Sequence, residues 1–251
     1  RVSNYGVGNY GLDQSLLRLS RQYKEDPTNT VILSAFTGTM ARCVSVYRHY
    51  LEPGNIFAIK PRFYLEHDGS LKVLKYPLKK KQDLLCLEHY KKFFRKHDAH
   101  YQFWRKSRLG YYMHQLPNVI GFKLGLCVSL HSPLASKFEY EISFWQSEQE
   151  LFYGMMRKYQ QLSQQNGFKA FFVLQHPQES LRYLERRSVK KGPWDAVLQR
   201  AAIDFPSIKF LDTSKFFKKS KSIDDLYTKG GGHHSPFANY LIASELNKLL
   251  Y

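Results

Sequence analysis

Short apolar runs of strand length, separated by helical patterns, constrain the fold of this chain more than any other feature. The runs are Thr30–Phe36, Phe168–Leu174 and Ile208–Leu211. A long helical pattern over Gln146–Asn166 precedes the second run, and another over Pro193–Ile203 precedes the third. Strands that alternate with helices are joined by parallel β-α-β crossovers. We therefore predict an α/β fold, a three-layer α/β/α sandwich around a parallel sheet.

The remaining patterns predict one domain over residues 1–251 with an insertion at about 52–145. Helices are expected over Gln14–Lys24, Thr37–Tyr50 and Pro236–Leu250. Within the insertion, Arg62–Leu74 alternates as a β-hairpin does, and Asp83–Lys96 has helical spacing before an irregular aromatic-rich stretch.

The chain begins at Arg1 rather than at a methionine, in residues Arg1–Asn4 that resemble the end of a strand. We therefore expect a fragment or a processed form, truncated at its N-terminus. Every apolar run is shorter than the ~20 residues that a membrane helix needs, so no membrane span is predicted.

The chain is strongly basic, with 38 Lys and Arg residues against 21 Asp and Glu residues and a formal charge of +17. Such an excess attracts polyanions, including nucleic acid and anionic polysaccharide. The lysines cluster at positions such as 79–81, 190–191 and 218–221. No nucleic-acid recognition motif accompanies them, so we expect solvated basic faces with nonspecific polyanion contact.

The cysteines Cys43, Cys86 and Cys127 lie far apart, in no spacing typical of metal ligands. An odd number without a disulfide framework favours free thiols and leans towards a reducing, cytoplasmic compartment. No metal site is predicted.

Glycine-rich segments near both ends of the chain hold the residues of greatest chemical interest. The first is Asn4-Tyr-Gly-Val-Gly-Asn-Tyr-Gly-Leu-Asp-Gln14, and the second is Gly230-Gly-Gly-His-His-Ser-Pro-Phe-Ala-Asn239. Glycines free the backbone to bring a histidine into a site, and a Ser-Pro pair starts the helix that follows. Both segments are expected at the carboxyl ends of strands, where the functional groups of such sheets gather.

The first segment also contains Gly6, Gly8 and Gly11 as G-x-G-x-x-G, a pattern typical of dinucleotide-binding turns. However, Asp13 would place a carboxylate at the helix start, where the pyrophosphate would bind, and no acidic residue ends a strand near position 33. A tight strand-to-helix turn is the preferred interpretation, and no nucleotide cofactor is predicted.

Together, these segments resemble the SGNH/GDSL hydrolase family. The first is similar to its motif N-x-G-V-x-G-Y-G-x-D-Q, in which a loop N–H helps to form the oxyanion hole. The second is similar to its last motif, in which the catalytic histidine is followed by Ser or Asn. The resemblance implies an SGNH/flavodoxin-like fold without metal or dissociable cofactor. It also implies an esterase, deacetylase or acyl transferase acting on a small-molecule or carbohydrate ester.

When the positions of the last motif are carried over to this sequence, the resemblance implies that His233 is the base and that His234 fills the variable position after it. Gly8 and Asn9 would form the oxyanion loop, and asparagine tolerates the positive φ that a glycine would adopt there. A serine hydroxyl needs such a base to take its proton, and the tetrahedral oxyanion needs donors that already point at it.

The chain departs from the family pattern at other positions. The nucleophile belongs to a motif upstream of Asn4, and no serine here occupies it, because Ser15 and Ser34 fall inside a helix and a strand. The donor Asn of the third motif aligns with Met40, so Thr37 or Thr39 is expected to lend support.

The acid that usually precedes the histidine is replaced by Gly230 and Gly231. Asp224, Asp225 or a backbone carbonyl would have to substitute for it. At the same sheet edge, Asp212 is expected to be structural and His176 is a candidate for substrate contact, while Arg42, Arg48 and His49 are expected to be solvated or to pack. The alternative function is a non-catalytic, basic carbohydrate- or polyanion-binding module on the same fold.

Overall fold

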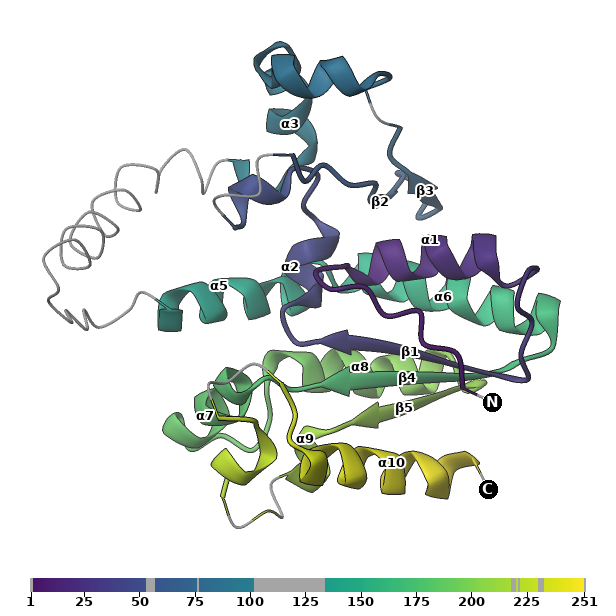
Figure 1. The fold of residues 1–251 in the computed structure, drawn as a ribbon, viewed down its shortest axis with the longest axis vertical. Helices are drawn as coiled ribbons and strands as arrows, with labels where there is room; N and C mark the ends of the chain where they lie inside the picture. The colour runs from purple at the N-terminus through teal and green to yellow at the C-terminus, as the bar shows by residue number, and fades with distance from the viewer. Residues whose placement is uncertain are drawn as a thin grey trace, which may run out of the picture.

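A parallel sheet of three strands lies between helices in a computed structural model of the chain (Figure 1). The strands β1 (Thr30–Phe36), β4 (Lys169–Gln175) and β5 (Ile208–Asp212) pair in the order β1-β4-β5. All are parallel, so their carboxyl ends meet at one edge of the sheet. The predicted α/β fold with a parallel sheet flanked by helices is confirmed.

The structure describes residues 2–52, 57–75, 77–101, 134–217, 220, 222–229 and 233–250. Several residues singled out in the sequence therefore lie outside the described residues: Arg1, Cys127, Lys218, Lys219, Lys221, Gly230 and Gly231. Most of the expected irregular stretch of the insertion lies outside them as well.

The main core covers one face of the sheet. Leu33, Phe172 and Ile208, one from each strand, belong to a single buried cluster with side chains of the flanking helices. These helices are α1 (Leu12–Gln22), α2 (Thr39–Cys43), α5 (Leu134–Ser147), α6 (Gln149–Asn166), α7 (Gln178–Arg186) and α8 (Pro193–Asp204). The sequence predicts α6 and α8 to within a few residues but predicts neither α5 nor α7.

A second cluster forms on the opposite side of β5. Leu211 packs there, whereas its neighbour Phe210 packs on the main core, because successive side chains of a strand point to opposite faces. The cluster joins β5 to α9 (Ser214–Phe217), the 3-10 turn η3 (Asp224–Leu226) and α10 (Pro236–Leu250). Helices therefore cover both faces of the sheet, as a three-layer sandwich requires.

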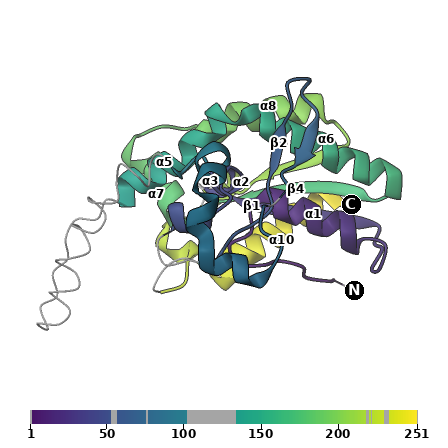
Figure 2. The ribbon, with the colours of Figure 1, turned by 90° about the horizontal axis from the view of Figure 1, so that it is seen from above.

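The insertion lies over the α1–α6 side of the sheet (Figures 1 and 2). It contains the predicted antiparallel hairpin, β2 (Phe63–Leu65) with β3 (Leu71–Val73), followed by η2 (Lys81–Tyr90) and α3 (Lys91–His97). The hairpin packs on α6 at Gly154, where an added Cβ would lie 3.0 Å from Leu65. A glycine at this point lets the hairpin approach the helix closely.

The predicted helix over Thr37–Tyr50 is wrong in its second half. Helix α2 ends at Cys43, and only the 3-10 turn η1 (Arg48–Tyr50) follows. The buried carboxylate of Asp98 accepts hydrogen bonds from the backbone N–H groups of Val46, at 2.6 Å, and Tyr47, at 2.7 Å. Because these N–H groups are bound to a residue some fifty positions away, they cannot continue the helix.

The strand expected at Arg1–Asn4 is not found in its described part. Residues 2–6 belong to neither sheet, and Val2 is 95% exposed. No described strand pairs with these positions, so they lack the backbone hydrogen bonds that hold a strand in a sheet. Among the described helices, none combines the length and the apolar character needed to cross a membrane.

Candidate functional site

The residues that directly follow the strands mark the carboxyl edge of the sheet. Thr37 follows β1, His176 follows β4 and Thr213 follows β5, and none of the three side chains is exposed to solvent. The hydroxyl oxygens of Thr37 and Thr213 have no hydrogen-bond partner among the described residues. Unpaired buried hydroxyls are uncommon in native proteins, so this edge differs from the interior around it.

Three buried polar residues, His176, Ser180 and Asp212, form a hydrogen-bonded group at the edge of the sheet beside β5. His176 Nε2 lies 2.8 Å from Asp212 Oδ1, and His176 Nδ1 lies 3.0 Å from Ser180 Oγ. Ser180 donates its hydroxyl to the carbonyl of Pro177, and Asp212 accepts the N–H of Ser214. Burial alone would raise the pKa of Asp212, but the interactions with His176 and the hydrogen bonds from Ser214 together outweigh it and hold the pKa below its usual value.

This group ties strands to helices rather than facing a substrate. His176 and Ser180 are fully buried, and the His176 ring packs against Trp194 with 4.9 Å between ring centroids. The trio has the composition of a catalytic triad, but a triad must reach its substrate. In this structure, His176 is therefore a structural residue rather than the substrate contact considered from the sequence.

The N-terminal loop lies at the carboxyl end of β1, next to α2. The N–H of Leu12, the first residue of α1, donates to Thr39 Oγ1 at 3.2 Å, so this hydroxyl fixes the helix start. Just before it, Asn9 adopts φ = 71°, the left-handed conformation expected for the oxyanion-loop position. Gly8 and Asn9 are exposed, and their N–H groups donate to no described residue. These N–H groups are free to bind an acceptor.

Arg48 holds this loop in place. Its Nη1 donates to the carbonyl oxygen of Asn9 at 2.7 Å, and its Nη2 donates to Asn9 Oδ1 at 3.1 Å. Its guanidinium also pairs with Glu52 at 2.6 Å. From the sequence, Arg48 was expected to be solvated or to pack, and no local pattern links it to a loop 39 residues earlier.

Substitutions at Asn9 should separate the backbone effect from the side-chain effect. Asn9→Ala and Asn9→Gly both remove the amide that Arg48 binds, but only glycine adopts φ = 71° without strain. We expect the alanine variant to be less stable than the glycine variant by about 1 kcal/mol, because left-handed φ costs a Cβ-bearing residue ~1–2 kcal/mol. Urea denaturation of both variants measures the difference. Equal midpoints would mean that the loop does not hold this conformation in solution.

The first turn of α1 already carries a buried ion pair. Lys60 Nζ lies 2.5 Å from Asp13 Oδ2, and both side chains are almost fully buried. Burial raises the pKa of Asp13, although the charge and hydrogen bond of Lys60 oppose the shift. The position at which a dinucleotide pyrophosphate would bind is thus occupied by a carboxylate, in agreement with the interpretation of the glycines as a tight turn.

The histidines of the last motif differ in their surroundings. His234 is half-buried, its Nε2 lies 3.1 Å from the carbonyl oxygen of His176, and its ring packs near Phe36, Phe217 and Tyr227. Burial lowers the pKa of His234, although its hydrogen bond to the His176 backbone opposes the shift. His233 is exposed, and its carbonyl accepts the N–H of Thr228 at 3.0 Å. His234 therefore anchors the segment at the end of β1, and His233 beside it is exposed to solvent.

The remaining predicted support residues have other partners. Asp224 pairs with Arg182 at 2.7 Å, and the backbone carbonyl of Asp225 accepts the Ser235 hydroxyl at 2.6 Å. Within the part of the chain that the structure describes, neither carboxylate is hydrogen-bonded to His233. Met40 is fully buried and cannot donate, and Thr37 keeps its hydroxyl unpaired.

Among the cysteines that the structure describes, the buried Cys43 does not supply a nucleophile at this edge. Cys43 and Cys86 are free thiols, but burial raises the pKa of Cys43 to about 12, and a thiol must ionise to react. Over the described ranges, no three His, Cys, Asp or Glu side chains gather as metal ligands would. Comparison with protein-family models, curated proteins and solved structures finds no match to this chain.

Proposed function

We propose that this chain carries the base and the oxyanion loop of an SGNH/GDSL-type hydrolase that acts on ester bonds. The observation that carries the proposal is the pair of free N–H groups at Gly8 and Asn9, in a loop that Arg48 clamps at the carboxyl edge of the sheet. The motif containing His233 reaches the same edge, since the ring of His234 lies near Phe36 at the end of β1.

The chemistry assigns a separate task to each part. His233 takes the proton of a serine hydroxyl, whose oxygen attacks the ester carbonyl carbon. The carbonyl oxygen becomes an oxyanion held by the N–H groups of Gly8 and Asn9, and each such donor typically contributes ~3–4 kcal/mol. His233 then protonates the leaving alcohol, and water cleaves the acyl-serine through the same steps. The resemblance places the serine in a motif upstream of Asn4.

A pre-steady-state assay tests the proposal. With p-nitrophenyl acetate, we expect the 251-residue chain to show no burst of p-nitrophenol, because the resemblance assigns the nucleophile to a motif that no serine of these 251 residues occupies. A longer chain in which a segment carrying the family's nucleophile motif precedes Arg1 should show a burst of about one equivalent. A burst of equal size in both chains would place the nucleophile within these 251 residues. The absence of a burst in both would contradict the hydrolase function.

The alternative function is a non-catalytic, basic binding module on the same fold. The specific observations in its favour are the lack of a described carboxylate bonded to His233 and the buried Met40 at the position of the family's donor. A catalytic Ser-His dyad can dispense with the carboxylate, and the N–H groups of Gly8 and Asn9 and the imidazole of His233 lie in two segments that both resemble motifs of the same hydrolase family. We therefore favour the hydrolase.

A further inference from the structure

A basic lobe, residues 77–97, contains η2 and α3 and projects from the sandwich at the top of Figure 1. Its sequence has seven Lys and Arg residues against Asp83 and Glu88, and all seven basic side chains are exposed. They are Lys79, Lys80, Lys81, Lys91, Lys92, Arg95 and Lys96. The residues of the chain that lie outside the described ones include no Asp or Glu, so they cannot cancel this charge.

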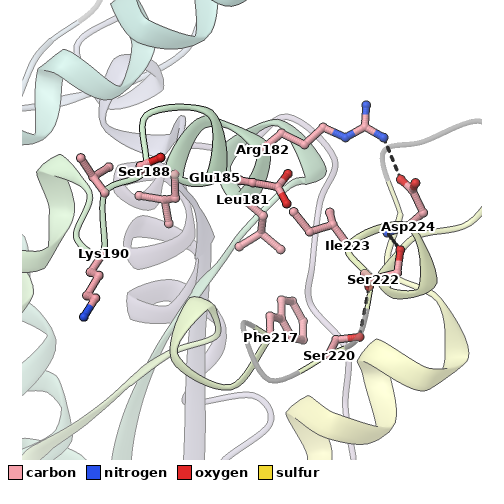
Figure 3. A pocket seen from close by; sticks show the side chains of 12 residues that line it. Leu181, Arg182, Glu185, Ser188, Lys190, Phe217, Ser220, Ser222, Ile223 and Asp224 are labelled. Carbon is pink, nitrogen blue, oxygen red and sulfur yellow. Dashed lines mark hydrogen bonds and ion pairs between the residues drawn. The ribbon is translucent and has the colours of Figure 1, made fainter.

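Few carboxylates in the structure balance these side chains. Among the described residues, only Lys91 of the seven forms an ion pair, with Glu88 on the preceding turn. By contrast, Arg182 on the rim of the cavity beside α7 pairs with Asp224 at 2.7 Å (Figure 3). The lobe therefore carries positive charge that the described part of the protein leaves uncompensated.

The lobe also holds its two groups of basic residues close together. The Asp83 carboxylate accepts the N–H groups of Lys79, at 2.7 Å, and Lys80, at 2.9 Å. The same carboxylate accepts the hydroxyl of Tyr90, which directly precedes α3. On α3, basic residues recur four positions apart, at 91 and 95 and at 92 and 96, so like charges neighbour one another on the helix. Such pairs destabilise a helix, and a bound anionic surface offsets the repulsion.

An exposed apolar side chain lies between these groups in the sequence. Leu85 is 79% exposed, and η2 buries none of its side chains. The backbone of Cys86 departs from helical φ/ψ, so η2 is kinked directly after this leucine. The phosphate backbone of a nucleic acid offers no apolar medium to such a side chain, whereas the interface of a bilayer accepts leucines beside lysines. The combination favours an anionic membrane over a nucleic acid.

We propose that the basic lobe binds anionic membrane surfaces, with Leu85 inserted among the lipid headgroups. The lysines and Arg95 then lie against the lipid phosphates and carboxylates, and each basic residue near such a surface typically strengthens binding about fivefold. The association is peripheral. It does not rest on the proposed hydrolase function, because neither the oxyanion loop nor His233 belongs to the lobe.

Co-sedimentation of the 251-residue chain with vesicles tests the proposal. One set consists of phosphatidylcholine alone, and the other of phosphatidylcholine mixed with phosphatidylserine. We expect binding only to the mixed vesicles, and weaker binding as the salt concentration rises. The combined variant Lys79→Gln, Lys80→Gln and Lys81→Gln should weaken this binding at least tenfold.

A matched control separates the lobe from the charge of the whole chain. It removes three basic residues from exposed positions on α6, β4 and β5: Arg157→Gln, Lys169→Gln and Lys209→Gln. The total charge falls by the same amount as in the lobe variant, but we expect binding to change less than threefold. Equal losses in the two variants, or no binding to mixed vesicles, would overturn the proposal.

Leu85→Ser decides between a membrane and a nucleic acid. We expect it to weaken binding to mixed vesicles at least fivefold and to leave the binding of a DNA duplex unchanged. Ile203→Ser, at an equally exposed apolar position on α8, should alter neither. Full vesicle binding by Leu85→Ser, or tighter binding of the duplex than of vesicles at equal phosphate concentration, would overturn the proposal. Vesicle binding without an acyl burst in the longer chain would instead contradict only the hydrolase function.

Discussion

His233→Ala is expected to lower kcat for ester hydrolysis by about 100- to 10,000-fold in the longer chain, the usual contribution of a general base. His233 is exposed at the end of the segment that His234 anchors, so it can approach a substrate without rearrangement of the core. The loss should appear in both the burst and the steady state of p-nitrophenyl acetate hydrolysis, because the same imidazole acts in both halves of the reaction.

His234→Phe is the matched control for this prediction. Phenylalanine keeps a ring among Phe36, Phe217 and Tyr227 and loses only the contact with the His176 carbonyl. We expect kcat to fall less than tenfold in this variant. A large loss in His234→Phe together with nearly full activity in His233→Ala would assign the base to His234.

Lys60→Met is expected to destabilise the fold by about 3–5 kcal/mol, the usual cost of breaking one partner out of a buried ion pair. Asp13 is fully buried in the first turn of α1, and its carboxylate would lose the ammonium group 2.5 Å away. Guanidinium denaturation at neutral pH measures the change. Lys248→Met, which breaks the exposed pair with Glu245, should have little effect.

The same variant should regain stability as the pH falls. Burial already raises the pKa of Asp13 above its usual value, and loss of Lys60 removes the interactions that oppose this shift. The folded state then binds a proton more readily than the unfolded state, so the free energy of unfolding rises as the pH decreases from neutrality towards the unfolded-state pKa, about 4. Asp13→Asn combined with Lys60→Met should recover most of the loss at neutral pH. A deficit that stays constant with pH would mean that Asp13 is not the source of the destabilisation.

The sequence alone is sufficient for the features that depend on local pattern. The apolar runs that become β1, β4 and β5, the helices α6 and α8, and the hairpin β2–β3 all follow from spacing and turn residues. The left-handed backbone at Asn9 follows from the resemblance, which places a glycine position there, and asparagine tolerates this conformation better than most residues. These features need no knowledge of distant parts of the chain.

The tertiary structure decides the features that depend on partners far apart in the sequence. Asp98 binds the N–H of Tyr47 and so ends the helix predicted to reach Tyr50, Arg48 clamps Asn9, and Lys60 neutralises Asp13. Burial likewise makes His176, a candidate for substrate contact from the sequence, a structural partner of Asp212. Periodicity and propensity describe neighbours along the chain. Hydrogen bonds and ion pairs between distant residues form only when the fold brings them together, so the partners of this site could not be predicted from the sequence.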